Sequence, residues 1–260
     1  LNASLLPFAD RVVDAFLQSL KAYGFRCPMF ISQNDGTLMN ADFVRQYPAL
    51  TFASGPTNSL RGAFKLTGLH DAIVVDIGGT TSDIGVLQNG FPRQSNVVVD
   101  VGGVRTNFRM PDIKALGLGG GSYVSSDGAS IGPQSCGQRL VEEGLVFGGN
   151  RLTATDIAVA TGVEGVGDPA NLSTLNNSVV QTALATMREM LNDNIEMMKP
   201  NAEPVPVILV GGGALLVQGE LDCASRVLRP EHAGVANAIG AAIAQVGGES
   251  ESLQSYSALG

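Results

Sequence analysis

The feature of this sequence that most constrains its fold is a buried apolar run that ends in an acidic turn rich in glycine and threonine. Ala72 to Val75 has the composition of a buried strand and leads straight into Asp76-Ile77-Gly78-Gly79-Thr80-Thr81-Ser82-Asp83. A second apolar run, Ile84 to Leu87, follows at once, so the chain is expected to fold back as a hairpin. Gln88-Asn89-Gly90 is a further hairpin signal, and it is expected to lead to a third strand through Val97-Val98-Val99.

The turn between the first two strands has the residue types of a phosphate-binding hairpin. Glycines let backbone amides approach phosphate oxygens, and threonine hydroxyls can donate hydrogen bonds to the same oxygens. The residues expected to do so are Gly78, Gly79, Thr80 and Thr81. The carboxylates of Asp76 and Asp83 can hold a magnesium ion or orient a water molecule. The alternative is a tight hairpin turn without a ligand, in which Asp76 caps the turn by accepting hydrogen bonds from local amides.

A second glycine cluster follows about 130 residues later along the chain. Val205 to Val210 is an apolar run with the composition of a strand, and it ends in Gly211, Gly212 and Gly213. Bare backbone at this point can pass beneath a flat adenine and ribose, and the alternative is a glycine-rich turn without a ligand. Gly234 to Val246 is predicted to be a helix of small residues.

The order of these parts resembles the actin, Hsp70 and sugar-kinase superfamily, in which a phosphate motif, an adenosine glycine motif and a closing helix succeed one another. The resemblance implies an α/β fold, an actin-like (ribonuclease H-like) ATPase lobe with a mixed sheet flanked by helices. It also implies ATP and Mg²⁺ as cofactors, with Asp76 as a metal ligand and Asp76 and Asp83 as catalytic residues. Residues 1–260 are expected to form one domain, the second lobe of such a fold, whose first lobe lies upstream and outside this chain.

A closer resemblance is to the hydantoinase A / 5-oxoprolinase family, and it covers nearly the whole chain. The landmarks that carry it are, in order, Asn2-Ala3 with Leu6-Pro7, Gln33-Asn34-Asp35-Gly36, Ser54-Gly55-Pro56, the phosphate motif, Gly119-Gly120-Gly121-Ser122, Gly132-Pro133-Gln134-Ser135 and Thr155-Asp156. The family commonly continues its GPxSAG stretch with a PGPACYG-like segment. Here Ser135-Cys136-Gly137 leads instead to Gln138-Arg139-Leu140-Val141-Glu142-Glu143-Gly144. This departure bears on substrate identity more than on nucleotide binding.

The family resemblance implies an ATP-dependent hydrolase that opens a cyclic amide, such as a hydantoin, 5-oxoproline or a related ring, by phosphorylating the carbonyl oxygen. It also implies a partner, either a separate B-type subunit or a fused downstream domain, and an oligomeric assembly. Two alternatives use the same phosphate motif: a nucleotide-driven conformational switch that reactivates another enzyme, and a small-molecule kinase.

Composition excludes several other classes of protein. The chain is 44% hydrophobic and has a net charge of −8, so few basic residues remain to neutralise nucleic acid or anionic lipid. No run reaches the roughly 18 apolar residues that span a bilayer, and three scattered cysteines indicate neither a disulfide framework nor a zinc site. These features fit a cytoplasmic protein. The opening residues, from Leu1, resemble neither a signal peptide nor a native start, so a longer polypeptide is expected.

The remaining segments predict ordinary elements. Asp156 is expected to cap a helix that opens at Thr153, and the Gly119–Ser122 loop either faces the cleft between lobes or forms a bent hairpin. The other expected elements are a helix over 3–23, a short buried strand over 28–31, a helix over 41–47, a loop over 54–59 feeding a helix over 60–67, an irregular stretch over 128–149, a long helix over 174–198 and a frayed tail over 248–260.

Overall fold

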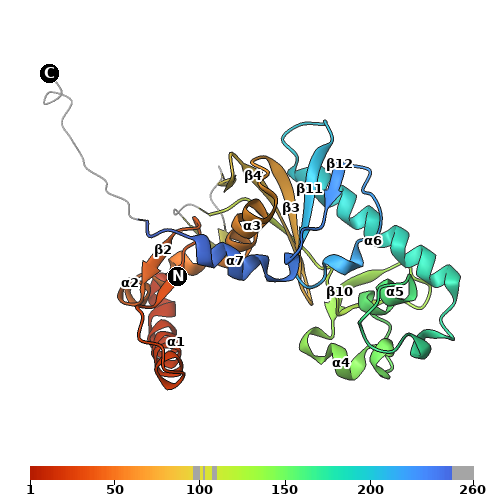
Figure 1. Ribbon diagram of the computed structural model, residues 1–260, viewed down its shortest axis with the longest axis horizontal. Coiled ribbons are helices and arrows are strands. Elements are labelled where there is room, and N and C mark those ends of the chain that lie inside the picture. Colours follow the sequence, from red (N-terminus) through yellow and green to blue (C-terminus); the bar gives the residue numbers. More distant parts are fainter. Residues whose placement is uncertain (96–99, 102, 107–109, 248–260) are drawn as a thin grey trace, which may run out of the picture.

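In the computed structural model, the chain is built around one mixed β-sheet (Figure 1). The structure describes residues 1–95, 100–101, 103–106 and 110–247; the predicted third strand through Val97–Val99 and the predicted tail over 248–260 lie outside these residues. Strands follow the order β12, β11, β3, β4 and β5, and β8 also pairs with β4. Their bounds are β3 (Ala72–Ile77), β4 (Ser82–Gln88), β5 (Phe91–Pro92), β8 (Ile113–Leu116), β11 (Val205–Val210) and β12 (Ala224–Leu228).

The strand directions bring the two glycine motifs to the same edge of the sheet. β3 pairs antiparallel with β4, and β11 pairs parallel with β3. Because parallel strands end at the same edge, the turn after β3 and the glycines after β11 become neighbours. The predicted hairpin at Asn89-Gly90 is confirmed: both residues have positive φ, 53° and 79°, as a tight two-residue turn requires.

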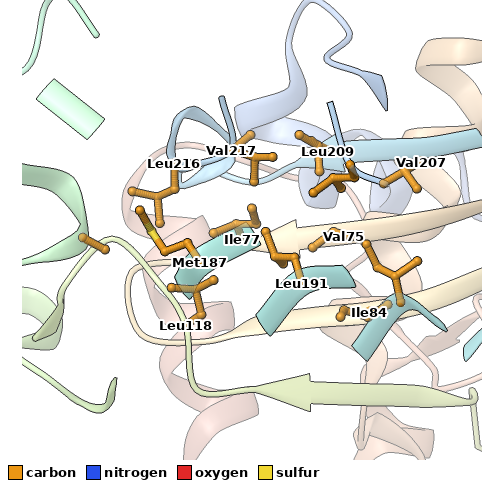
Figure 2. Packing of buried hydrophobic residues seen from close by; sticks show 14 of the residues in the cluster. Val75, Ile77, Ile84, Leu118, Met187, Leu191, Val207, Leu209, Leu216 and Val217 are labelled. Carbon is orange, nitrogen blue, oxygen red and sulfur yellow. The ribbon is translucent and has the colours of Figure 1, made fainter. Parts of the chain in front are cut away.

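One face of the sheet is covered by α6 (Asn177–Met198), with α5 (Ala154–Ala160) beside its site edge. Figure 2 shows Met187 and Leu191 of α6 packed against apolar side chains of the sheet and of the segment that follows β11. The long predicted helix is confirmed, but it begins at Asn177 because the Asn176 side chain accepts a hydrogen bond from the Ser178 amide and caps it.

The opposite face is covered by α3 (Ser54–Thr67) and α7 (Ala236–Ile243), which lie side by side in Figure 1. Their backbones touch: a side chain at Gly62 would overlap the carbonyl of Ala236, and one at Gly240 would overlap the backbone of Asn58. The predicted loop over 54–59 is wrong, because the helix already begins at Ser54. Ala53 adopts a left-handed conformation, φ 57°, that starts the helix there, and the first turn tolerates a proline that has no N–H to donate.

The other segment that differs from prediction on this face is the closing helix. It is shorter than the predicted 234–246, since Ala233–Val235 forms the 3₁₀ turn η6 and α7 ends at Ile243. The 3₁₀ turn leaves the carbonyl of Ala233 free to accept a hydrogen bond from Gly211.

The N-terminal segment forms a small unit of its own beside α3 and α7 (Figure 1). Val13, Met39 and Val44 make its core, and the two predicted helices are confirmed. The strand predicted over 28–31 is wrong in part: β1 starts at Phe30, which is exposed, because it pairs only with β2 in a two-stranded ribbon. The bounds are α1 (Asn2–Ala22), β1 (Phe30–Ser32), β2 (Leu38–Asn40), α2 (Ala41–Gln46) and η1 (Pro48–Thr51).

The stretch predicted to be irregular over 128–149 folds into short elements next to α5. A separate ribbon of β9 and β10 leads into three short helical turns, η2, α4 and η3. Earlier in the chain, β6 and β7 pair in a second two-stranded ribbon. Their bounds are β6 (Asp100–Val101), β7 (Val104–Arg105), β9 (Ser122–Val124), β10 (Ile131–Ser135), η2 (Gly137–Arg139), α4 (Leu140–Glu143), η3 (Leu145–Phe147), η4 (Pro169–Leu172) and η5 (Ala214–Leu216). Within the part of the chain that the structure describes, no helix is long and apolar enough to cross a bilayer.

Candidate phosphate-binding site

The two predicted catalytic carboxylates lie opposite each other on neighbouring strands. Asp76 of β3 is in direct register with Asp83 of β4, so both side chains project from the same face, the one that α3 and α7 cover. Both residues are half-buried. Burial, and then the negative charge of Asp76, raises the pKa of the Asp83 carboxyl. A cation placed between the two carboxylates would relieve this repulsion.

The turn that joins these strands presents its polar groups to solvent. The Gly78 amide donates to the Thr81 carbonyl at 2.8 Å, which closes the turn. Gly79, Thr80 and Thr81 are exposed at the edge of the sheet. No hydrogen bond joins the Asp76 carboxylate to an amide of the described turn 77–81, so the alternative in which Asp76 caps this turn has no support in the geometry.

The glycine loop Gly119–Ser122 lies directly against this turn. Gly120 and Gly121 donate from their amides to the carbonyls of Gly78 and Gly79, at 3.0 and 2.7 Å. A side chain at Gly119 would overlap the backbone of Thr80. The loop is therefore a buried support that holds the phosphate turn from behind, a role that the spacing of the sequence did not specify.

The glycines after β11 complete the site from the other side. A side chain at Gly211 would overlap the Asp76 carboxylate, and Gly213 donates from its amide to the Ile77 carbonyl at 2.7 Å. Gly211 has a φ of +85°, which favours glycine on its own account. Gly212 is exposed, with open space where a side chain would be. The structure thus brings the two predicted motifs into contact and leaves the backbone of Gly212 exposed to solvent.

Helix α3 also packs close to Asp83, which the sequence did not predict. Leu60, six residues after the helix start, packs on Gly85, two residues beyond Asp83. The Asn237 side chain of α7 donates to the Gly55 carbonyl at 2.8 Å and fixes the first turn of α3. The Ser54-Gly55-Pro56 landmark was the available signal.

Asp156 serves the fold and not the site. It is fully buried and accepts hydrogen bonds from the amides of Leu145, Val146 and Thr153 at 2.7–3.2 Å. Together with the Thr153 hydroxyl it forms a capping box at the start of α5, so the predicted helix cap is confirmed. The preceding hydroxyl, of Thr155, donates to the Gly120 carbonyl at 2.8 Å and anchors the glycine loop.

A groove of about 650 Å³ lies elsewhere, between α6 and residues 216–223, and none of the predicted site residues lines it.

The donor set at the turn fits a magnesium ion bound together with phosphate. Within the described residues no group of three or more His, Cys, Asp or Glu side chains gathers as a metal cage. Mg²⁺ is commonly held by only one or two carboxylates, with substrate phosphates and waters completing its six ligands. Asp76 and Asp83, next to an exposed turn of glycine and threonine, match that arrangement.

Comparison with known proteins agrees with this geometry. The family model described as hydantoinase/oxoprolinase matches residues 1–164. This chain belongs to the hydantoinase/oxoprolinase family. Among curated proteins, the chain is 25% identical over 213 residues to the uncharacterized protein MJ0964 of Methanocaldococcus jannaschii, covering 75% of this chain and 31% of that protein.

Two named relatives are more informative about chemistry. The caprolactamase subunit alpha of Pseudomonas jessenii is 27% identical over 169 residues, covering 62% of this chain and 24% of that protein. The acetophenone carboxylase gamma subunit of Aromatoleum aromaticum is 28% identical over 170 residues, covering 62% of this chain and 23% of that protein. The chain therefore spans between about a quarter and a third of the length of the curated relatives it matches.

Solved structures confirm the predicted fold class. Nucleotide-free acetone carboxylase superposes with a TM-score of 0.70 at 20% identity, over 89% of this chain and 37% of that one. The ATP-dependent caprolactamase of Pseudomonas jessenii also gives 0.70, at 22% identity, over 94% of this chain and 40% of that one. The mixed sheet flanked by helices is thus the fold of these two structures, in agreement with the predicted actin-like fold class.

Proposed function

We propose that this chain is the phosphate-binding lobe of an ATP-dependent enzyme that opens a cyclic amide, such as a hydantoin, 5-oxoproline or a related lactam. The observation that carries the proposal is the contact between the Asp76 carboxylate and Gly211, which joins the phosphate motif to the adenosine glycine motif. Family membership supports the same conclusion, as does the likeness to a protein named as an ATP-dependent caprolactamase.

In this mechanism the chain's residues hold and orient the reactants. Bound MgATP supplies a phosphoryl group that makes a ring carbonyl carbon open to attack by water. Gly78, Gly79, Thr80 and Thr81 would bind phosphate oxygens through amides and hydroxyls, and the glycines 211–213 would line the nucleoside. Asp76 would hold magnesium directly or through water, or orient the attacking group, while Asp83 would assist it from the facing strand.

The amide step would proceed in three stages. The carbonyl oxygen would attack the terminal phosphorus and ADP would leave, so that the ring carbon carries a phosphate ester oxygen as well as the ring nitrogen. A first water would add to that carbon, a proton would pass to the ring nitrogen, and the C–N bond would break to leave an acyl phosphate. A second water would hydrolyse the acyl phosphate to a carboxylate and inorganic phosphate. Phosphorylation is useful because an amide carbonyl is otherwise a poor electrophile, and protonation lets the ring nitrogen leave as an amine.

The complete enzyme is proposed to include more than this chain. A first lobe would close the nucleotide cleft from the other side, and a B-type subunit or fused downstream domain would contribute to the substrate site. Two of the relatives are named as subunits, which supports a multi-subunit assembly. We place the enzyme in the cytoplasm, in keeping with its acidic composition and three free cysteines.

The proposal is tested by phosphate release from MgATP by the complete protein with its neighbouring subunit. Hydantoin, 5-oxoproline and caprolactam are added in turn, and ring-opened product is quantified by mass spectrometry. We expect one ring compound to stimulate turnover, and Asp76→Asn to abolish it. Asp127→Asn is the matched control, since that carboxylate lies in an exposed loop and only accepts hydrogen bonds from Ser125 and Ala129.

Slow phosphate release that ignores every ring compound, yet is lost in Asp76→Asn, would refute the amidohydrolase. It would leave the nucleotide-driven switch, or a small-molecule kinase if a stable phosphorylated product accumulates.

A further inference from the structure

The 3₁₀ turn η2 (Gly137–Arg139) lies against the phosphate turn through Gly137 and carries a cation, Arg139, that the proposed mechanism does not use. A methyl group at Gly137 would lie 3.7 Å from Thr80 Oγ1, so the two turns are in contact. The Ser135 hydroxyl just before this turn donates to the Gly79 carbonyl at 3.4 Å. A 3₁₀ helix rises about 2 Å per residue, so Arg139 starts about 4 Å along the turn from Gly137. An extended arginine side chain is longer than that separation.

The ion pair that Arg139 makes in this structure is weak. Its Nη1 pairs with Glu143 Oε1 at 2.8 Å, four residues on, while 60% of the arginine side chain stays exposed. Exposed pairs of this kind contribute about 0–1 kcal/mol, so the guanidinium can leave at little cost.

Glu143 does not depend on Arg139 for a partner. Its other oxygen, Oε2, accepts a short hydrogen bond from the Tyr123 hydroxyl, and this bond is the first cause of the raised pKa of Tyr123. The proton therefore stays on the phenol, and the Tyr123 ring is itself covered by the Arg151 guanidinium at 4.3 Å. Tyr123 and Arg151 hold the carboxylate in place when Arg139 moves.

The charges at the turn create a need for such a cation. Asp76 and Asp83 are both acidic, so positive charge on the other side of an anionic ligand would add to the attraction of a bound magnesium ion. We propose that Arg139 leaves Glu143 to bind an oxyanion held over the phosphate turn. The planar guanidinium suits two oxygens of a phosphate or a carboxylate.

Two sources of oxyanion fit this chemistry, the terminal phosphate of the nucleotide and a carboxylate carried by the ring substrate. This inference rests on the proposed function only for bringing the ligand to the turn. It assigns a role to the segment in which the chain departs from the pattern of its family, Gln138 to Gly144.

The test compares Arg139→Gln with Glu143→Gln in the complete protein, by calorimetric titration. The probes are MgATP, inorganic phosphate, 5-oxoproline and its uncharged counterpart 2-pyrrolidinone. Arg139→Gln should weaken oxyanion binding roughly 10- to 100-fold, the value of a charge-assisted hydrogen bond. Glu143→Gln keeps the tyrosine contact but releases the arginine, so it should tighten the same binding by up to about fivefold. Arg11→Gln, on exposed α1, controls for the loss of one positive charge.

The two substitutions are expected to change oxyanion affinity in opposite directions, which distinguishes a binding role of Arg139 from a structural role. Loss confined to MgATP and phosphate assigns Arg139 to the nucleotide, and loss for 5-oxoproline but not 2-pyrrolidinone assigns it to a substrate carboxylate. Equal weakening in both variants, with a matching fall in the unfolding temperature, means a structural ion pair and overturns the inference. If the wild-type protein binds neither MgATP nor a ring compound, the proposed function fails. Phosphate affinity that Arg139→Gln leaves unchanged then overturns this inference separately.

Discussion

Gly211 is the position where one added methyl group should do the most harm at the candidate site. Its φ of +85° lies in the left-handed region, which costs a residue with a side chain about 1–2 kcal/mol. The methyl would also overlap the Asp76 carboxylate and the Ile77 carbonyl, and overpacking of this kind costs about 1–3 kcal/mol. Gly211→Ala should therefore destabilise the protein by roughly 2–5 kcal/mol.

Gly212→Ala is a control one residue away. Gly212 is exposed, its φ is not in the left-handed region, and nothing lies within 4 Å of the position of an added methyl. Its unfolding free energy should change by no more than about 0.5 kcal/mol. Urea unfolding of both variants, followed by circular dichroism, measures the difference, and titration with MgATP measures the loss of binding expected when Asp76 is displaced. Equal stability and equal MgATP affinity in the two variants would refute the packing of Gly211 on Asp76.

Three further substitutions test other parts of the structure. Leu191→Ala should lower the unfolding free energy by about 2–5 kcal/mol, because Leu191 is 1% exposed under the sheet, whereas exposed Leu17→Ala should cost far less in the same urea titration. Asp156→Ala should cost at least about 3 kcal/mol, since three amides lose their acceptor, and a thermal midpoint within error of wild type contradicts that role. Asp83→Asn should raise the unfolding midpoint at pH 7 while reducing MgATP turnover. Because the pKa of Asp83 is raised in the folded state, ionised Asp83 destabilises the fold. This destabilisation is absent below pH 3.8, where the carboxyl is protonated in both states, and is complete above the raised pKa. The stability gained by Asp83→Asn should therefore vanish in acid.

Local signals in the sequence predicted the parts of this fold that depend on local chemistry. The strand before Asp76, the turn at Asn89-Gly90 and the cap at Asp156 each follow from residues within a few positions of one another. The sheet and its two helical layers followed from resemblance to known proteins. Asp76, Asp83 and the two glycine motifs do meet at one edge, while their roles toward ATP and Mg²⁺ stay predictions.

Contacts between residues far apart in the sequence could not be predicted, because local patterns do not specify which distant segments pair. The contact of Asp76 with Gly211 depends on parallel pairing of β3 with β11, which no local pattern encodes. The start of α3 at Ser54 was missed because serine, glycine and proline are typical of loops, and only the left-handed Ala53 shows where the helix begins. Arg139 was noted as part of an unusual segment, but the contact of Gly137, at the start of the same turn, with Thr80 depends on how that segment folds.

The contact between α3 and α7 restricts how these two helices can move relative to each other. Because Gly62 and Gly240 have no side chains, the two helix backbones pack in direct contact, and this close packing resists sliding of one helix along the other. A tilt of α3 must therefore carry α7 with it, and through the hydrogen bond between Gly211 and Ala233 it must also pull on the glycines beside Asp76. The close packing of α3 on α7 therefore links the position of α3 to the candidate nucleotide site through Ala233 and Gly211.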